Sequence, residues 1–330
     1  MKLGIFHTTQ YDLETNPSIA WETYSRHARL IDDSGFHSIW VGEHHVTSTS
    51  QYFQPIPTIA NLGAITNRVQ LGIGALLLPL HNPIYIAELG GVLDVITGGR
   101  FTMACGLGYR DAEFAMFGVD KAERVGRLVE GVRLIKRLWS EENVTFDGEY
   151  FSVENISINP KPLQNPLPLL LAGYVDAAAK RSAKIANGWM YGNIADKNEI
   201  KRQLELYEKF RDEFDRRNVT KSPIMLREGF VLDDDREAFE TVEPYLKGKF
   251  EGYENWGLEG LNMDTDFEDF CQDRFIIGDP ETAIDELTEY AELGIEHMIL
   301  RVRYPGIDEQ AVEKCLQTLA DEVIPHVDGA

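Results

Sequence analysis

Residues 37–45 read His-Ser-Ile-Trp-Val-Gly-Glu-His-His, a β-forming apolar run that ends in a glycine and three titratable side chains. Similar short runs recur along the chain and alternate with amphipathic segments, which is the pattern of parallel βαβ units. Eight runs are predicted as strands, at residues 2–7, 37–42, 69–77, 100–105, 167–172, 188–191, 224–231 and 296–302. Eight βα pairs predict an α/β fold of the (β/α)₈ TIM-barrel type.

The segments between these strands carry helix boundary signals. Gly35 follows the first segment, Asp279-Pro280-Glu281 opens a late one, and Gly294 closes it. The predicted helices cover residues 20–34, 57–66, 83–97, 111–139, 176–186, 197–217, 235–249 and 308–324.

Length and composition favour one domain. The chain has 330 residues, of which 43% are hydrophobic and 26% charged, and no Ser/Gly-rich or Pro-rich linker divides it. We therefore expect a single barrel domain over residues 1–330, with two insertions. Residues 143–164 read as a hairpin around Asp147-Gly148. Residues 250–274, with Phe250, Tyr253, Trp256 and Phe267, are expected to form a lid over the catalytic face or a dimer contact.

The charge and cysteine content exclude several function classes. With 32 Lys+Arg against 54 Asp+Glu, the net charge is −22, which repels nucleic acid and anionic lipid. Cys105, Cys271 and Cys315 are odd in number and widely separated, so they predict neither a disulfide framework nor a zinc ligand set. No signal peptide or membrane-spanning stretch is predicted. The expected location is the cytoplasm.

In a barrel of this type the active site lies at the carboxyl ends of the strands. The second strand ends at Glu43-His44-His45. Because side chains alternate along a strand, one histidine is expected to face the mouth and the other to be structural. The nearby glutamate favours a functional histidine, since a carboxylate fixes an imidazole tautomer. A metal site formed by these three residues is disfavoured, because consecutive side chains diverge and the helical spacing of zinc ligands is missing.

Two segments could bind an anion. Residues 105–109, Cys-Gly-Leu-Gly-Tyr, follow the fourth strand as a phosphate loop would, yet they lack the third glycine of a dinucleotide fingerprint. Arg124 could contact the same phosphate, or could instead be a helix-surface arginine paired with Glu130 or Asp120. The second site is the amino end of the helix after the fifth strand, at residues 174–177.

The segments named above, together with several others, resemble the bacterial luciferase-like flavin-dependent oxidoreductases. The resemblance extends over nearly the whole chain. The matching blocks are residues 35–36, 40–45, 71–83, 88, 93–101, 106–110, 113–114, 117–118, 124, 130, 138–139 and 278–281.

The resemblance implies a barrel that binds reduced FMN, or the deazaflavin coenzyme F420, in its mouth. It places His44 near the reactive edge of the flavin, where it assists proton movement, and a non-prolyl cis peptide between Gly74 and Ala75. The cofactor-binding residues that it implies are Gly74, Ala75, Gly106, Gly108, Tyr109, Arg124, Gly173 and Tyr174. Two departures stand out. The first lies after the fifth strand, where the family's frequent phosphate-binding Ser or Thr is replaced by Tyr174, Val175 and Asp176, and Asp176 is expected to be the helix N-cap. The second is Leu107, which stands where luciferase has an arginine.

The function implied is a monooxygenase that takes reduced FMN from a separate flavin reductase and uses O₂ to oxidise a small organic substrate. The alternatives are an F420-dependent hydride-transfer oxidoreductase and, less favoured because His44 is present, a non-catalytic flavin-binding accessory protein. A homodimer is expected by analogy with the family. The substrate pocket is expected to include His7, Tyr52, Phe53 and Trp189.

Overall fold

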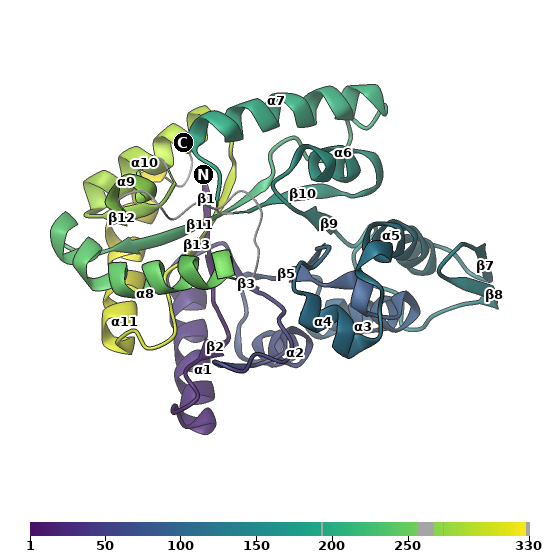
Figure 1. Cartoon of the computed structure of the whole chain (residues 1–330), viewed down its shortest axis with the longest axis horizontal. Helices are drawn as coiled ribbons and strands as arrows, with labels where there is room; N and C mark the ends of the chain where they lie inside the picture. The colour runs from purple at the N-terminus through teal and green to yellow at the C-terminus, as the bar shows by residue number, and fades with distance from the viewer. Residues whose placement is uncertain (193, 256–266, 273, 328–330) are drawn as a thin grey trace.

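The computed structural model describes residues 1–192, 194–255, 267–272 and 274–327. Its centre is a closed barrel of eight parallel strands surrounded by helices (Figure 1). The barrel strands are β1 (Lys2–Phe6), β3 (Ser38–Val41), β5 (Gln70–Leu76), β6 (Phe101–Cys105), β9 (Leu169–Ala172), β10 (Gly188–Tyr191), β11 (Ile224–Val231) and β13 (His297–Arg301). They pair in that order, and β13 closes on β1. The eight predicted strands and the (β/α)₈ fold class are confirmed.

The strands are buried on both faces, which is why they read as nearly continuous apolar runs. Side chains that fill the barrel interior form one cluster: Phe6, Trp40, Ala104, Leu170, Met190, Leu226 and Ile299. A larger cluster fills the space between the barrel and its helices. The interior is therefore packed below the mouth, so a ligand enters only at the rim.

The helices that cover the barrel follow the predicted order. They are α1 (Pro17–Asp33), α2 (Pro55–Ile65), α3 (Pro83–Ile96), α4 (Asp111–Phe117), α5 (Arg124–Ser140), α6 (Asp176–Ile185), α7 (Lys197–Glu213), α8 (Asp235–Asn255), α10 (Pro280–Glu292), α11 (Glu309–Thr318) and α12 (Ile324–Val327). The Asp279 side chain accepts a hydrogen bond from Thr282 N at the start of α10, as the cap signal predicted. Three further short helices are η1 (Leu78–Leu80), η2 (Lys121–Glu123) and the π-type η3 (Leu319–Val323). No helix among the described residues is long and apolar enough to cross a bilayer.

The prediction of one helix over residues 111–139 is wrong. Gly118, with φ 65°, ends α4 in the left-handed conformation that glycine adopts without steric cost. The Asp120 carboxylate then caps Ala122, and α5 begins at Arg124. The break matters for the site, because it places Arg124 at the start of a helix instead of the middle of one.

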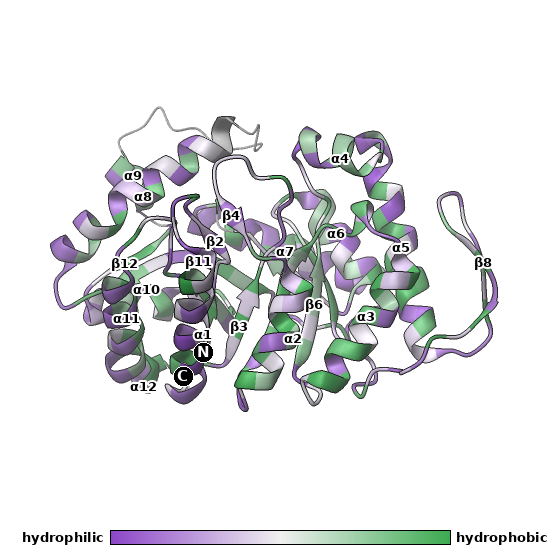
Figure 2. Cartoon of the chain, turned by 90° about the horizontal axis from the view of Figure 1, so that it is seen from below, coloured by the Kyte–Doolittle hydropathy of each residue, from purple (hydrophilic) through white to green (hydrophobic). Residues whose placement is uncertain are grey.

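The insertion at residues 143–164 is a hairpin of β7 (Val144–Asp147) and β8 (Ser152–Ile156), as predicted, and it projects from the barrel in Figures 1 and 2. The Glu130 carboxylate on α5 accepts the backbone N–H groups of Glu149, Tyr150 and Phe151, so it fixes the turn. Four short elements were not predicted: β2 (Gln10–Tyr11) pairs with β4 (Gln51–Tyr52), α9 (Phe267–Cys271) follows α8, and β12 (Ile276–Gly278) pairs with β11.

Candidate active site

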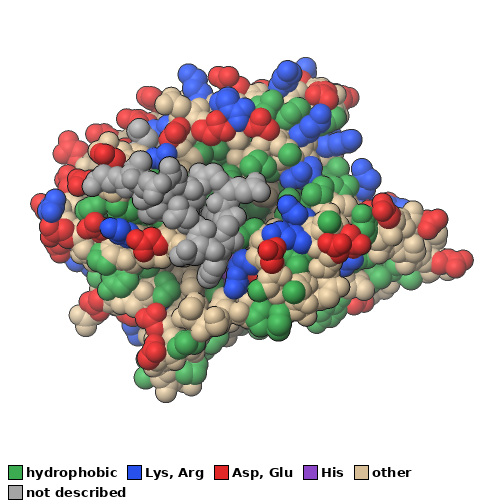
Figure 3. Space-filling model, in the orientation of Figure 1, with side chains coloured by type: hydrophobic (Ala, Val, Ile, Leu, Met, Phe, Trp, Pro, Cys, Tyr) green, Lys and Arg blue, Asp and Glu red, His purple; other side chains and the backbone are tan. Residues whose placement is uncertain are grey.

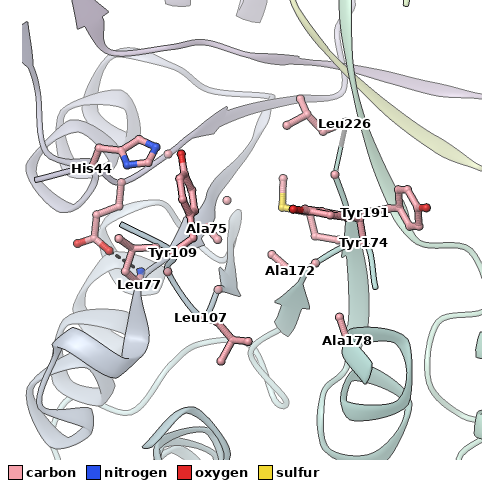
Figure 4. Close-up of a pocket in the computed structure, with 18 of the residues that line it drawn as sticks. His44, Ala75, Leu77, Leu107, Tyr109, Ala172, Tyr174, Ala178, Tyr191 and Leu226 are labelled. Atoms are coloured by element: carbon pink, nitrogen blue, oxygen red, sulfur yellow. Dashed lines mark hydrogen bonds between the residues drawn. The ribbon is translucent and has the colours of Figure 1, made fainter. Parts of the chain in front are cut away.

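A cavity of about 410 Å³ opens at the carboxyl ends of the barrel strands. It is lined by all nine predicted site residues: His44, Gly74, Ala75, Gly106, Gly108, Tyr109, Arg124, Gly173 and Tyr174. They come from the ends of four strands, β3, β5, β6 and β9, and from α5. These segments are far apart in the sequence and meet at the rim. Figure 4 shows His44 and Tyr109 on one side of the cavity and Tyr174 on the other.

His44 is held by a buried carboxylate. Its Nδ1 lies 3.1 Å from Oε1 of Glu113, which also accepts hydrogen bonds from His45 N and from Arg110. Burial opposes ionisation of Glu113, but the hydrogen bond from His44 and the charges of His44 and Arg110 hold the Glu113 pKa below its ordinary value. An ionised carboxylate only accepts, so Nδ1 carries the proton. In a neutral imidazole, Nε2 is then the nitrogen that takes up a proton.

Two aromatic rings fix the orientation of the His44 ring. Tyr52 and Tyr109 lie edge-on to it, at centroid distances of 5.6 and 6.1 Å. Tyr52 lines the cavity as predicted, whereas the prediction for His7, Phe53 and Trp189 is wrong, because they are absent from its lining. His7 is buried and stacks on Tyr24, Phe53 packs edge-on to Tyr11 and Trp21, and buried Trp189 donates a hydrogen bond to Gly173 O.

Glu43, which lines the cavity, forms a cluster with His45 and His81, which do not. Oε1 of Glu43 lies 3.0 Å from Nε2 of His45 and 2.8 Å from Nε2 of His81, and its other oxygen accepts Leu77 N–H. Burial disfavours the charge, yet these donors lower the Glu43 pKa to about 2. One atom from each of the three side chains lies within 4.8 Å of the others, so geometry alone would admit a metal ion. The hydrogen bonds already satisfy the carboxylate. His44, which the sequence grouped with this pair, faces Glu113 instead.

The floor of the cavity is backbone. The peptide bond between Gly74 and Ala75 is cis, as the resemblance implied. A Cβ atom added at Gly106 would lie 2.9 Å from the Cβ of Ala75, and Gly108 has φ +76°. Gly106 must therefore be glycine because Ala75 lies so close to it, and Gly108 because of its left-handed backbone conformation. The resulting smooth surface suits a flat ring system.

The opposite end of the cavity is strongly positive. Arg124 on α5 and Arg181 on α6 both line it, as does Lys121. Burial and the neighbouring Arg124 guanidinium lower the Arg181 pKa, so the two arginines are close enough to repel. Among the described residues, no carboxylate lies within 4 Å of either guanidinium, and neither Glu130 nor Asp120 pairs with Arg124, which donates to Lys121 O. Two like charges with no carboxylate nearby in the described part of the chain indicate an anion site.

The amino end of α6 borders the same end of the cavity. Gly173, Tyr174 and Val175 line it, whereas Asp176 does not. The prediction that Asp176 caps its own helix is wrong: the cap position is Val175, and the Asp176 carboxylate binds Arg202 on α7. Asp176 therefore neither caps the helix nor repels an anion in the cavity.

Several lining residues were missed from the sequence, among them Lys121, Arg181, Met190 and Leu226. Helical spacing could have found Arg181, because it lies one turn beyond Ala178, which also lines the cavity. Glu113, the partner of His44, stands in a matching block but was given no role. Of the predicted lid residues, Phe250 and Phe267 are buried and pack on Phe270, outside the lining. Trp256 and the Tyr253 side chain lie outside the described residues.

These features fit a planar cofactor that carries a phosphate. The backbone floor and apolar side chains such as Leu77, Leu107 and Met190 suit the ring, and the arginine pair with the α6 amino end suits the phosphate. The barrel fold and this site thus suit a planar, phosphate-bearing cofactor bound at the mouth of the barrel.

The family described as "Luciferase-like monooxygenase" matches residues 1–297, so the chain belongs to that family. Among curated relatives, 4-hydroxyprotoasukamycin monooxygenase of Streptomyces nodosus subsp. asukaensis is 30% identical over 185 residues, which is 56% of this chain and 50% of that protein. The first curated relatives are matched over only 50–59% of their length.

Solved structures share the fold. Monooxygenase RslO1 from Streptomyces bottropensis has a TM-score of 0.87 at 23% identity, with 99% of each chain covered. An F420-dependent secondary alcohol dehydrogenase bound to an F420–acetone adduct has a TM-score of 0.81 at 21% identity and covers 99% and 98%. The oxygenating constituent of 3,6-diketocamphane monooxygenase of Pseudomonas putida, in complex with FMN, has a TM-score of 0.80 at 19% identity, with 99% of each covered. Proteins described as monooxygenases and as F420-dependent dehydrogenases are therefore among the relatives and structural neighbours of this chain.

Proposed function

We propose that the protein is a monooxygenase that uses reduced FMN, delivered by a separate flavin reductase, and O₂ to oxidise a small organic substrate. The observation that carries this proposal is the Arg124–Arg181 pair across the cavity from the His44–Glu113 pair. When bound, reduced FMN supplies the electrons that let O₂ react with the substrate. The protein residues position the cofactor, exclude water and move a proton.

The arginine pair favours FMN over F420. The phosphate of FMN is a monoester that carries nearly two negative charges at neutral pH, while a phosphodiester carries one. The two guanidiniums, which have no carboxylate of a described residue close by, match the dianion in charge, and the N–H groups at the amino end of α6 add donors. An F420-dependent hydride-transfer enzyme is the second candidate, because such enzymes occur among the structural neighbours.

His44 is the proposed catalytic residue. With its Nδ1 proton held by Glu113, the ring has one orientation and one tautomer, so Nε2 accepts and returns a proton at the cavity. The surrounding apolar side chains and the two tyrosine rings limit the access of water. The presence of this dyad argues against a purely accessory role.

Binding of four ligands to the purified full-length chain tests the proposal: FMN and F420, each oxidised and reduced. We expect reduced FMN to bind more tightly than either form of F420. The R181Q variant should lose about tenfold or more in FMN affinity, as expected for one charged hydrogen bond, while riboflavin, which lacks the phosphate, should bind both proteins equally. R217Q removes an exposed arginine and is the matched control. Tight binding of F420 alone would reject the proposal.

We also propose a homodimer through α2 and α3. α2 contains no charged residue, and α3 contains Glu88 and the buried Asp94. Figure 2 shows hydrophobic colour along both helices, and Tyr85, Val92, Val95 and Ile96 are exposed. Two copies with a net charge of −22 repel, so a face that is nearly free of charge is where they approach most easily. In sedimentation experiments, V92E should shift the protein towards monomer, whereas E154Q on the projecting hairpin should not.

The remaining proposals concern domain organisation and location. We infer one barrel domain over residues 1–330, in which the 143–164 hairpin is an insertion. Cys105, Cys271 and Cys315 are all buried free thiols, which supports a reducing compartment such as the cytoplasm. Tagged protein that fractionates with an oxidising compartment would contradict this location.

A further inference from the structure

A third arginine lines the cavity, on a different wall from the phosphate end. Arg301 ends β13, and in the closed barrel β13 lies four strands from β6, directly across the mouth from the loop that carries Gly106 and Gly108. Its guanidinium carbon lies 4.4 Å from the centroid of the Phe6 ring, whose face fixes the plane of the guanidinium. The Arg301 side chain is 13% exposed.

A buried charge cluster stands behind Arg301. Glu228, its register partner on β11, has a fully buried side chain, and its Oε1 lies 3.9 Å from Nη1 of Arg301. Lys249 on α8 donates a hydrogen bond to the same carboxylate. Burial and the Arg301 charge together lower the Lys249 pKa to about 7, although Glu228 opposes this shift. Arg301 and Lys249 therefore place two basic groups around one buried carboxylate.

The cavity concentrates positive charge in a protein that is otherwise acidic. The lining contains Lys121, Arg124, Arg181 and Arg301 but, among described residues, one carboxylate, that of Glu43, which is turned to its histidine partners. In Figure 3, Lys and Arg side chains gather beside the hollow at the centre of this face. Such a site attracts small anions that the rest of the surface repels.

We propose that Arg301 binds an oxyanion, a carboxylate or a phosphate, on the substrate, so that the substrate class is a small organic acid or phosphate ester. This inference rests on the proposed function, in which the Arg124–Arg181 end holds the cofactor phosphate. A guanidinium on a ring face presents two parallel N–H donors, which suits bidentate recognition of an oxyanion. The bound oxyanion lies across the mouth from the backbone loop at Gly106 and Gly108.

The first experiment uses inorganic phosphate as a probe of the full-length chain without cofactor, in isothermal titration calorimetry. Two phosphate sites are expected. R301Q should remove one, and the double variant R124Q/R181Q should remove the other. A wild-type chain with a single site that R301Q leaves intact would overturn the inference.

The second experiment uses the FMN-loaded chain and compares benzoate, phenyl phosphate and neutral benzyl alcohol. R301Q should weaken benzoate or phenyl phosphate binding about tenfold or more and leave benzyl alcohol unchanged, because one charge-assisted contact is lost. R301K should give an intermediate loss, and it replaces R301Q if that variant does not fold. R217Q is the control of equal charge change. The proposal would be refuted if R301Q bound the anions as tightly as wild type does. It would also be refuted if R301Q weakened only the binding of FMN.

The two experiments separate the inference from the proposed function. If the chain fails to bind FMN but the Arg301-dependent phosphate site persists, the proposed cofactor is wrong and the anion site stands. If FMN binds and R301Q weakens the binding of no anion, the proposed cofactor stands and the anion site at Arg301 is wrong.

Discussion

Glu43 offers a direct test of the electrostatics beside the active site. Its side chain is 2% exposed, and it accepts hydrogen bonds from His45, His81 and Leu77 N. The pKa falls from 4.5 to about 2, and one pKa unit corresponds to about 1.4 kcal/mol, so ionised Glu43 stabilises the fold by about 3 kcal/mol at pH 7. Glutamine imitates the protonated side chain. E43Q should therefore lower the free energy of unfolding by about this amount.

The sign of the pH dependence follows from the lowered pKa. The stabilisation is complete above pH 4.5, where the unfolded carboxyl is ionised, and it is lost as the pH falls towards about 2, the folded value. At pH 3 the gap between E43Q and wild type should shrink to about 1 kcal/mol. Urea unfolding at both pH values measures it, with E154Q as an exposed control of equal charge change. If E43Q matches E154Q at pH 7, or if its deficit is the same at pH 3, the assigned role of Glu43 is wrong.

Three further predictions concern other parts of the chain. H44Q should reduce substrate oxidation by about a hundredfold or more, as expected for loss of general acid–base catalysis, and change the FMN dissociation constant less than threefold; a comparable loss of FMN binding would contradict the proposed role. E113Q should lower the rate of substrate oxidation and change the FMN dissociation constant less than about threefold, because His44 Nδ1 loses the carboxylate that fixes its tautomer, and an unchanged rate would leave Glu113 merely structural. G118A should destabilise the fold by about 1 kcal/mol, since φ is 65° there, whereas G248A in the open interior of α8 should stabilise it by a few tenths to about 1 kcal/mol; thermal melts of the two variants test the pair.

The barrel was predictable because each strand is a compact apolar run between helix signals. Local sequence also identified the hairpin turn at Asp147-Gly148 and the helix start at Asp279. It failed at Gly118, where helical periodicity continues on both sides of the break, so that only the left-handed backbone conformation reveals it. The short strand β12 was missed because its pairing with β11 is a tertiary contact.

The site residues at strand ends could be predicted from the sequence. The side chains that pair with them were harder to predict. The position of His44 followed from the barrel, but its partner Glu113 lies 69 residues away in another βα unit. The pairing of Asp176 with Arg202 likewise overrode a reasonable local cap assignment. The sequence also places Arg110, Arg301 and Arg303 near strand ends, with no local signal that tells their roles apart. The structure separates the three, because Arg303 is buried against Glu309 and Tyr11 and Arg110 binds Glu113.

The barrel divides its rim into two arcs that are consecutive in the sequence. His44, Glu113, the Gly74–Ala75 floor and Arg181 all precede β10, whereas Leu226 and Arg301 come from β11 and β13. Substitutions after residue 190 can therefore reshape one wall while the opposite wall keeps its own supporting contacts. A chimera joined near that residue, with its later half taken from a relative, would exchange one arc as a unit and leave the other intact.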